Sequence, residues 1–477
     1  MLRSLLNKFR NATPVAKASM ALLFANLVLK GLSLISGPIF TRIMPQAQYG
    51  IVSTFHSWES LLTVIVTLNL AAGVFNNGML DFKEDRSTFQ FSLLVVSSCM
   101  SVLAFIVFTI FKQQILTWLE LPEIIIYLML LKFLFVPAYS FWAGRQRFEY
   151  KYKALVCITI ANAISSMTLG IVGVLNSDPE NAAVTRIIAM ESVSITVGIV
   201  FFIILAVRAR FHFKPSYCKY AMKFNVPLVP HYLSMYVLSS SDRIMITKLV
   251  DSSATAIYSV AYTVASVITI VWQSIEASLS PWIYEKLHVG DIKPIRKVTA
   301  GIIALFAVMC LGSTLVAPEI MMILAPAEYS SGIYVIPPVA AGVFFTAMYS
   351  IYMRVELYHK KTTFATIATT CAALLNIVLN YIFIKLYGAI AAGYTTLFCY
   401  ATLALLHYLN IRRKGYQDII NNKAFLVLSM AVIAGSIIIS MIYDYPIIRF
   451  SLVGITMLTA IIKRKTIIRM LKLKNTK

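Results

Sequence analysis

Long apolar runs alternate with short polar connections along the whole chain. A helix that crosses a bilayer needs about 20 predominantly apolar residues, and fourteen runs approach that length. The pattern therefore predicts an all-α membrane protein with about 14 transmembrane helices. The predicted spans are residues 18–40, 51–73, 89–111, 123–142, 154–175, 184–206, 225–249, 255–277, 298–317, 333–355, 363–386, 388–410, 424–443 and 446–462.

The composition supports the membrane class. Of the 477 residues, 59% are hydrophobic and 13% are charged, whereas a soluble domain is about 45–50% apolar and about 25% charged. The formal net charge of +22 does not indicate a nucleic-acid partner, because such binders gather their cations on soluble surfaces that this chain lacks. The first apolar run follows Arg3, Lys8 and Arg10, as in a signal peptide. It has no small-residue cleavage site, so we expect a retained first span.

The basic residues predict an orientation. Lys and Arg accumulate in cytoplasmic loops. Of the 42 Lys and Arg residues, 32 lie at the two ends of the chain or in every second connection, and these segments are all on the same side of the membrane. We therefore expect a multi-pass membrane protein with both termini in the cytoplasm.

The chain also shows a weak internal repeat. Lys30 stands twelve residues before Arg42-Ile43-Met44, and His231 stands twelve residues before Arg243-Ile244-Met245. Chance is the alternative explanation for three identical residues. A parallel repeat would give an N-lobe (1–207), a basic aromatic linker on the cytoplasmic membrane face (208–223), a C-lobe (224–411) and a segment with two further helices and a basic tail (412–477).

Charged side chains inside spans cost about 2.5–3.5 kcal/mol each on insertion scales, so they generally face a bundle interior or a water-filled cavity. Lys30 and Glu59 each lie on a polar stripe of one helix face, and we expect the two stripes to line one cavity. Structural roles are the alternatives. The charges could form ion pairs that only fix helix packing, and Arg354, Glu276 and Glu356 could snorkel to the interface. Asp242 and Arg243 could be a local helix-end feature. The deep cations that suit an anionic substrate such as a phosphate are Lys30, Lys132, Arg186, Arg243 and Arg354.

Catalytic and metal-binding motifs are missing from the sequence. It contains no GxxxxGK[ST], HExxH, GxSxG or DxDxDG spacing, and its six cysteines form no CxxC pair. We therefore predict no catalytic residues, no metal site and no cofactor, and we expect transport to use a gradient of substrate or ions.

Several short motifs together resemble a known family. They are Phe40-Thr41-Arg42 with Gln48-Tyr49-Gly50, the segment Arg145 to Lys153, Asn225-Val226-Pro227-Leu228-Val229-Pro230 with Ser241-Asp242-Arg243, and Ala256-Ile257-Tyr258-Ser259-Val260-Ala261. The chain is similar to the polysaccharide transporters, or Wzx-type O-antigen flippases, of the multidrug/oligosaccharidyl-lipid/polysaccharide exporter superfamily.

This resemblance implies two six-helix lobes, two C-terminal helices and alternating access. The implied substrate is an undecaprenyl-pyrophosphate-linked repeat unit of O-antigen or a related surface polysaccharide, and the implied partners are this lipid-linked oligosaccharide, membrane lipids and the polysaccharide polymerase machinery. Lys30 stands where similar lipid II flippases have a cavity arginine, and His231 is the repeat-equivalent residue. Within this mechanism Glu59, Glu191 and Asp242 are candidates for coupling to H⁺ or Na⁺.

Two other functions remain as alternatives. A multidrug/cation antiporter of the same superfamily should have an acidic cavity, whereas the deep cations here match or outnumber the deep carboxylates. A membrane glycosyltransferase or polymerase should carry a large extracytoplasmic loop, and no connection on that side is long.

Overall fold

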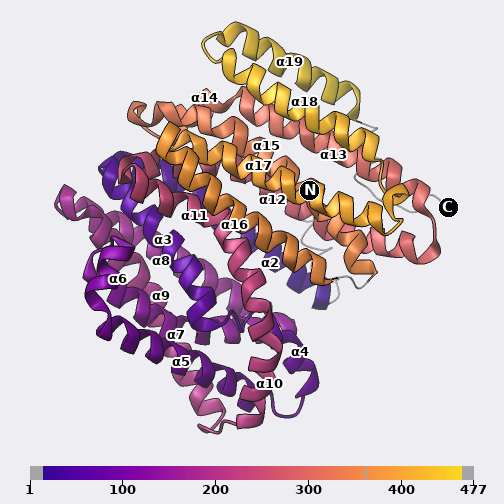
Figure 1. Cartoon of the computed structure of the whole chain (residues 1–477). Coiled ribbons are helices and arrows are strands. Elements are labelled where there is room, and N and C mark those ends of the chain that lie inside the picture. The colour runs from indigo at the N-terminus through magenta and orange to yellow at the C-terminus, as the bar shows by residue number, and fades with distance from the viewer. Residues whose placement is uncertain (1–13, 360–361, 465–477) are drawn as a thin grey trace, which may run out of the picture. The chain divides into compact units, whose positions relative to one another are not determined.

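The computed structural model describes residues 14–359 and 362–464, which are helical and contain no β-strand (Figure 1). The chain forms two compact units, the first ending at Leu233 and the second beginning at Ser234. This boundary lies inside helix α11 (Val229–Leu249).

The first unit is built around α7, which packs against α5 and α9, while α8 packs against α2 and α9. Its helices are α2 (Pro14–Ile43), α3 (Gln46–Thr67), α4 (Val74–Asp81), α5 (Arg86–Ile110), α6 (Lys112–Leu119), α7 (Glu123–Phe148), α8 (Tyr152–Leu175), α9 (Ala182–Arg208) and α10 (Pro215–Asn225). Pro137 cannot donate a backbone hydrogen bond to the carbonyl of Phe133 within α7. The hydroxyl of Ser101 on α5 donates to that carbonyl instead, at 3.0 Å.

The second unit is built around α15, which packs against α12, α13, α17 and α18. Its helices after α11 are α12 (Ser252–Val289), α13 (Ile292–Leu315), α14 (Ala317–Leu324), α15 (Ile336–Tyr358), α16 (Thr362–Tyr387), α17 (Ile390–Arg413), α18 (Asn422–Met441) and α19 (Pro446–Ile462). Most residues of α15 are buried, as expected of a helix that is apolar on all sides.

The predicted fold class is confirmed. Eleven helices of the described chain are long and apolar enough to cross a membrane. Of the fourteen predicted segments, the other three correspond to α3, α11 and α19. Helices α3 and α11 carry several ionisable residues, and α19 has only 17 residues. The protein is therefore an all-α, multi-pass membrane protein.

The second predicted span is interrupted. Helix α3 ends at Thr67, α4 begins at Val74, and Leu68 and Asn69 between them have φ values of 52° and 49°. Asn225 holds this open turn: its side chain is fully buried, donates a hydrogen bond to the carbonyl of Leu68 and accepts one from the backbone N–H of Val74 at 3.2 Å. The end of α10 thus satisfies backbone groups that the interruption of the helix would otherwise leave unpaired.

Helix α10, which contains most of the predicted linker, is fastened to the first unit. Tyr220 donates a hydrogen bond to Asp81 at 2.7 Å, and Lys214 and Tyr217 donate to Asp85 at 2.5 and 3.0 Å. Burial raises the pKa of Asp85, but hydrogen bonds from Lys214, Thr88 and Tyr217 outweigh it, so the pKa lies below its ordinary value. The linker is therefore one of the packed elements of this unit.

Candidate functional site

Three charged residues of the first unit meet inside it. The Lys132 ammonium on α7 lies 2.6 Å from a carboxylate oxygen of Glu59 on α3 and 2.6 Å from one of Glu191 on α9. The side chains are 16%, 16% and 5% exposed, respectively. Two carboxylates share one ammonium, so these three groups sum to one negative charge.

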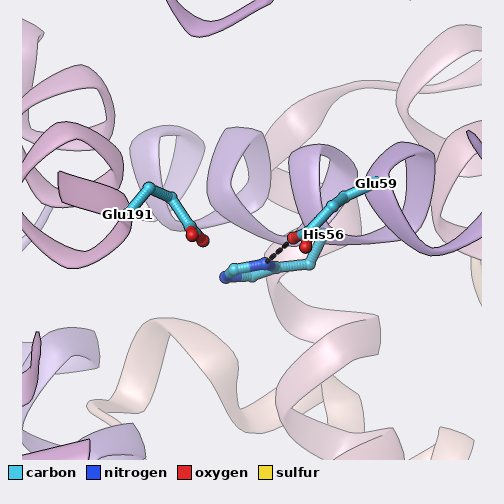
Figure 2. Close-up of side chains that lie close together, drawn as sticks. All are labelled: His56, Glu59 and Glu191. Atoms are coloured by element: carbon cyan, nitrogen blue, oxygen red, sulfur yellow. Dashed lines mark hydrogen bonds and ion pairs between the residues drawn. The ribbon is translucent and has the colours of Figure 1, made fainter. Parts of the chain in front are cut away.

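His56 extends this cluster toward the surface. Its Nδ1 lies 3.1 Å from the second oxygen of Glu59, and its side chain is 44% exposed. Figure 2 shows His56 and Glu59 projecting from the same helix, with the Glu191 carboxylate directed at them from another helix. We call His56, Glu59, Lys132 and Glu191 the charged cluster.

The charged cluster includes a geometric candidate for a metal centre. One ligand atom each from His56, Glu59 and Glu191 lie within 4.8 Å of one another. The Lys132 ammonium already lies against both carboxylates, so a metal ion would have to displace a tethered cation. The geometry therefore favours a chain of ion pairs over a metal site.

A cavity of about 150 Å³ adjoins the charged cluster. Its polar lining consists of Glu59, Thr63, Thr67, Asn69, Lys132 and Ser140, and Phe133 and Phe141 contribute to an apolar wall. The interrupted segment after α3 forms part of this lining. Asn225, which holds that segment, therefore helps to define the shape of the cavity.

The remaining predicted cations of the first unit lie in different environments. Lys30 is exposed on α2 and forms no ion pair with the described residues, and Glu59 pairs instead with Lys132 and His56. Arg186 is buried, with its guanidinium carbon 3.7 Å from the ring centre of Phe40 and 5.3 Å from that of Tyr49. His231 is half-buried beside the ring of Tyr232.

Asp242 in the second unit is the centre of a buried polar network. Its fully buried carboxylate accepts hydrogen bonds from Tyr258 at 2.6 Å, Asn380 at 2.7 Å and Thr396 at 2.9 Å. These donors come from α12, α16 and α17. The network joins four helices, so Asp242 is more than a local helix-end feature.

The neighbouring Arg243 contacts aromatic and backbone groups. Its guanidinium donates to the carbonyl of Ser239 at 3.0 Å and lies 4.5 Å from the ring centre of Tyr262. A cation over an aromatic face is stabilised by the ring quadrupole. Arg243 therefore lies against this ring beside the Asp242 network.

Arg354 and Glu276 lie in one ion pair, with 2.6 Å between nitrogen and oxygen. The snorkelling interpretation is wrong for Glu356, which is 1% exposed. It lies 2.8 Å from His407 Nδ1 and accepts a hydrogen bond from Asn410 at 2.6 Å. His407 could not be predicted as the partner of Glu356, because the spacing of residues within α17 does not show which residue of α15 lies next to them.

These features define a class of protein: a multi-pass, all-α membrane protein with ionised side chains enclosed between its helices, as in transporters. The family described as "Polysaccharide biosynthesis protein" matches residues 15–286. The chain belongs to this family.

Solved structures share the fold. A structure described as "Lipid II flippase MurJ, inward closed conformation" aligns with a TM-score of 0.67 and 16% identity, covering 95% of this chain and 100% of that chain. An inward-facing multidrug resistance MATE family transporter of the MOP superfamily aligns with a TM-score of 0.58 and 12% identity, covering 81% and 94%. An outward-facing one has a TM-score of 0.54 and 13% identity, covering 85% and 97%. No curated protein matches the sequence.

Proposed function

We propose that this protein is a flippase that moves a polyprenyl-pyrophosphate-linked oligosaccharide, the repeat unit of O-antigen or a related surface polysaccharide, across the bacterial cytoplasmic membrane by alternating access. Membership of the polysaccharide biosynthesis family is the observation that carries the proposal. The shared fold with a lipid II flippase supports a lipid-linked substrate. In this proposal both termini are cytoplasmic, the chain performs no catalysis, and the polymerase machinery receives the translocated unit.

The pyrophosphate of such a substrate needs cations without fixed carboxylate partners. Lys30 fits this requirement in the first unit because it is exposed and forms no ion pair within the part of the chain that the structure describes. Arg186, His231 and Arg243 stay in the proposal as further cationic contacts, whereas Arg354 and Lys132 are already paired with carboxylates of the protein. Lysine and arginine bind phosphate by charge and by donated hydrogen bonds.

We assign the coupling of transport to H⁺ or Na⁺ to Glu59, Glu191 and Asp242. A buried carboxylate changes its interactions strongly when it gains or loses a cation. Glu59 and Glu191 are linked through Lys132, and Asp242 is surrounded by oxygen and nitrogen donors from three other helices. Each would respond to a proton or sodium ion by rearranging contacts between helices.

Reconstitution tests the proposal directly. Purified protein in proteoliposomes should move a fluorescent lipid-linked oligosaccharide between leaflets, as measured by its accessibility to an impermeant quencher. A strain that lacks its own flippase should regain surface polysaccharide when it expresses the chain, and Lys30→Ala should lower that recovery at normal protein levels. Lipid movement no faster than in empty liposomes, together with efflux of organic cations, would establish the antiporter alternative.

A further inference from the structure

We propose that the cavity beside the charged cluster is a sugar subsite that selects among lipid-linked glycans, whereas their common pyrophosphate is bound elsewhere. The inference rests on the proposed function and assigns a part of the substrate to named residues of the first unit. It changes the predicted role of Lys132: instead of binding phosphate, Lys132 helps to form a site for uncharged groups of a sugar.

Charge is the first reason. The charges of Glu59, Glu191 and Lys132 sum to one negative charge. A protonated His56 would bring the net charge of the charged cluster to zero. Lys132 cannot approach a phosphate without leaving a carboxylate, and a buried charge that loses its partner is strongly destabilised. A pyrophosphate would therefore be repelled, whereas a hydroxyl, amide or amine group would not.

The hydrogen-bonding groups of the lining are the second reason. Thr63 and Thr67 donate their hydroxyl protons to the carbonyls of Glu59 and Thr63, at 2.6 and 2.7 Å, so their remaining lone pairs are acceptors. The side chains of Ser140 and Asn69 make no hydrogen bond to any described residue. The lining thus offers both donors and acceptors that protein groups have not used.

Size and shape are the third reason. The cavity volume of about 150 Å³ is below the roughly 300–1,000 Å³ of pockets that enclose a drug-sized ligand. It suits one sugar ring or one ring substituent rather than a whole repeat unit. Phe133 and Phe141 add an apolar part to the otherwise polar lining, which matches a sugar ring with a C–H face and a hydroxyl edge.

The test uses two lipid-linked glycans that share the polyprenyl pyrophosphate, differ in the attached sugar and are both moved measurably by the unaltered protein. The double variant Thr63→Val/Ser140→Ala removes two hydroxyls and nearly preserves volume. Lys30→Ala serves as the phosphate control, and Thr109→Val serves as the matched control because its hydroxyl is exposed and bonds only within α5, to Phe105 O at 2.9 Å.

We expect the double variant to change the ratio of the two transport rates by about tenfold, because it removes two hydrogen bonds to the preferred sugar. Lys30→Ala should slow both glycans equally, and Thr109→Val should change neither rate. An unchanged ratio in the double variant, at normal protein levels, would overturn the sugar subsite and leave the flippase proposal intact. If the unaltered protein moves neither glycan in any such pair, the proposed function itself fails.

Discussion

The hydrogen bonds of Asn225 to Leu68 and Val74, which we call the Asn225 clamp, allow a quantitative prediction for Asn225→Ala. The side chain is fully buried and pairs with the carbonyl of Leu68 and the N–H of Val74. Removing it leaves two backbone groups without their partner, and each buried group left unpaired costs about 1–3 kcal/mol. We therefore expect the variant to lose about 2–6 kcal/mol of unfolding free energy.

Gly73→Ala should disturb the same contacts of Asn225, because the new methyl group would collide with the Asn225 side chain. A Cβ at residue 73 would lie 2.2 Å from Asn225 Oδ1, closer than unbonded atoms approach, and 3.3 Å from Asn225 Cγ. Once Asn225 is alanine, the nearest remaining atom is the Tyr232 hydroxyl oxygen, 3.0 Å away. The double variant Gly73→Ala/Asn225→Ala should therefore be no less stable than Asn225→Ala alone, as for two changes that remove one shared interaction.

Thermal unfolding of the purified variants in detergent, followed by intrinsic fluorescence, measures these differences. Gly31→Ala is the matched glycine control, because nothing lies within 4 Å of a Cβ built there. It should unfold at or above the temperature of the unaltered protein, since alanine favours a helix by about 0.5–1 kcal/mol over glycine. Additive losses in the double variant would refute the shared clamp, and so would an Asn225→Ala variant as stable as the original.

Three further predictions concern other ion pairs. Arg449→Gln should lower the thermal midpoint measured in detergent, because the buried guanidinium makes two hydrogen bonds to Glu319, at 2.8 and 2.7 Å; Lys423→Gln, a change in a residue outside this pair, is the control. The midpoint difference between the original protein and Asp85→Asn should be present at pH 7 and vanish as the pH falls through about 4 and below. The reason is that the lowered pKa of Asp85 stabilises the fold only while the carboxylate is ionised beside Lys214. Glu356→Gln should unfold at a lower temperature at neutral pH, because it breaks a contact between fully buried partners; an unchanged midpoint would contradict this.

The sequence predicted the helices well because the bilayer imposes length and apolarity on each span separately. The three segments that fall outside the eleven apolar candidates were still found, because α3, α11 and α19 begin and end near polar connections. What the pattern did not reveal is the interruption after Thr67. No proline marks that position, and the partner that makes the open turn favourable, Asn225, lies 151 residues from Val74.

The sequence identifies the charged residues but does not identify which of them form pairs, and each outcome has its own physical reason. Their cost in a membrane makes them stand out in any apolar run, so Glu59, Lys132 and Glu191 could be singled out. Which side chains meet depends on how α3, α7 and α9 pack against one another. The periodicity within a single helix carries no information about this packing. The prediction that the polar stripes of Lys30 and Glu59 line one cavity therefore did not include Lys132, a residue that Glu59 contacts.

These pairings change what a count of deep charges can say about the substrate. Lys132 faces two carboxylates and Arg354 faces one, so neither offers an uncompensated charge. The excess of deep cations that argued against a cation antiporter therefore loses weight, and the choice of an anionic lipid-linked substrate rests on the family and on Lys30. It follows that Lys30→Ala should impair transport of every pyrophosphate-linked glycan more than Thr63→Val does. Equal losses in the two variants would contradict the assignment of anion binding to Lys30.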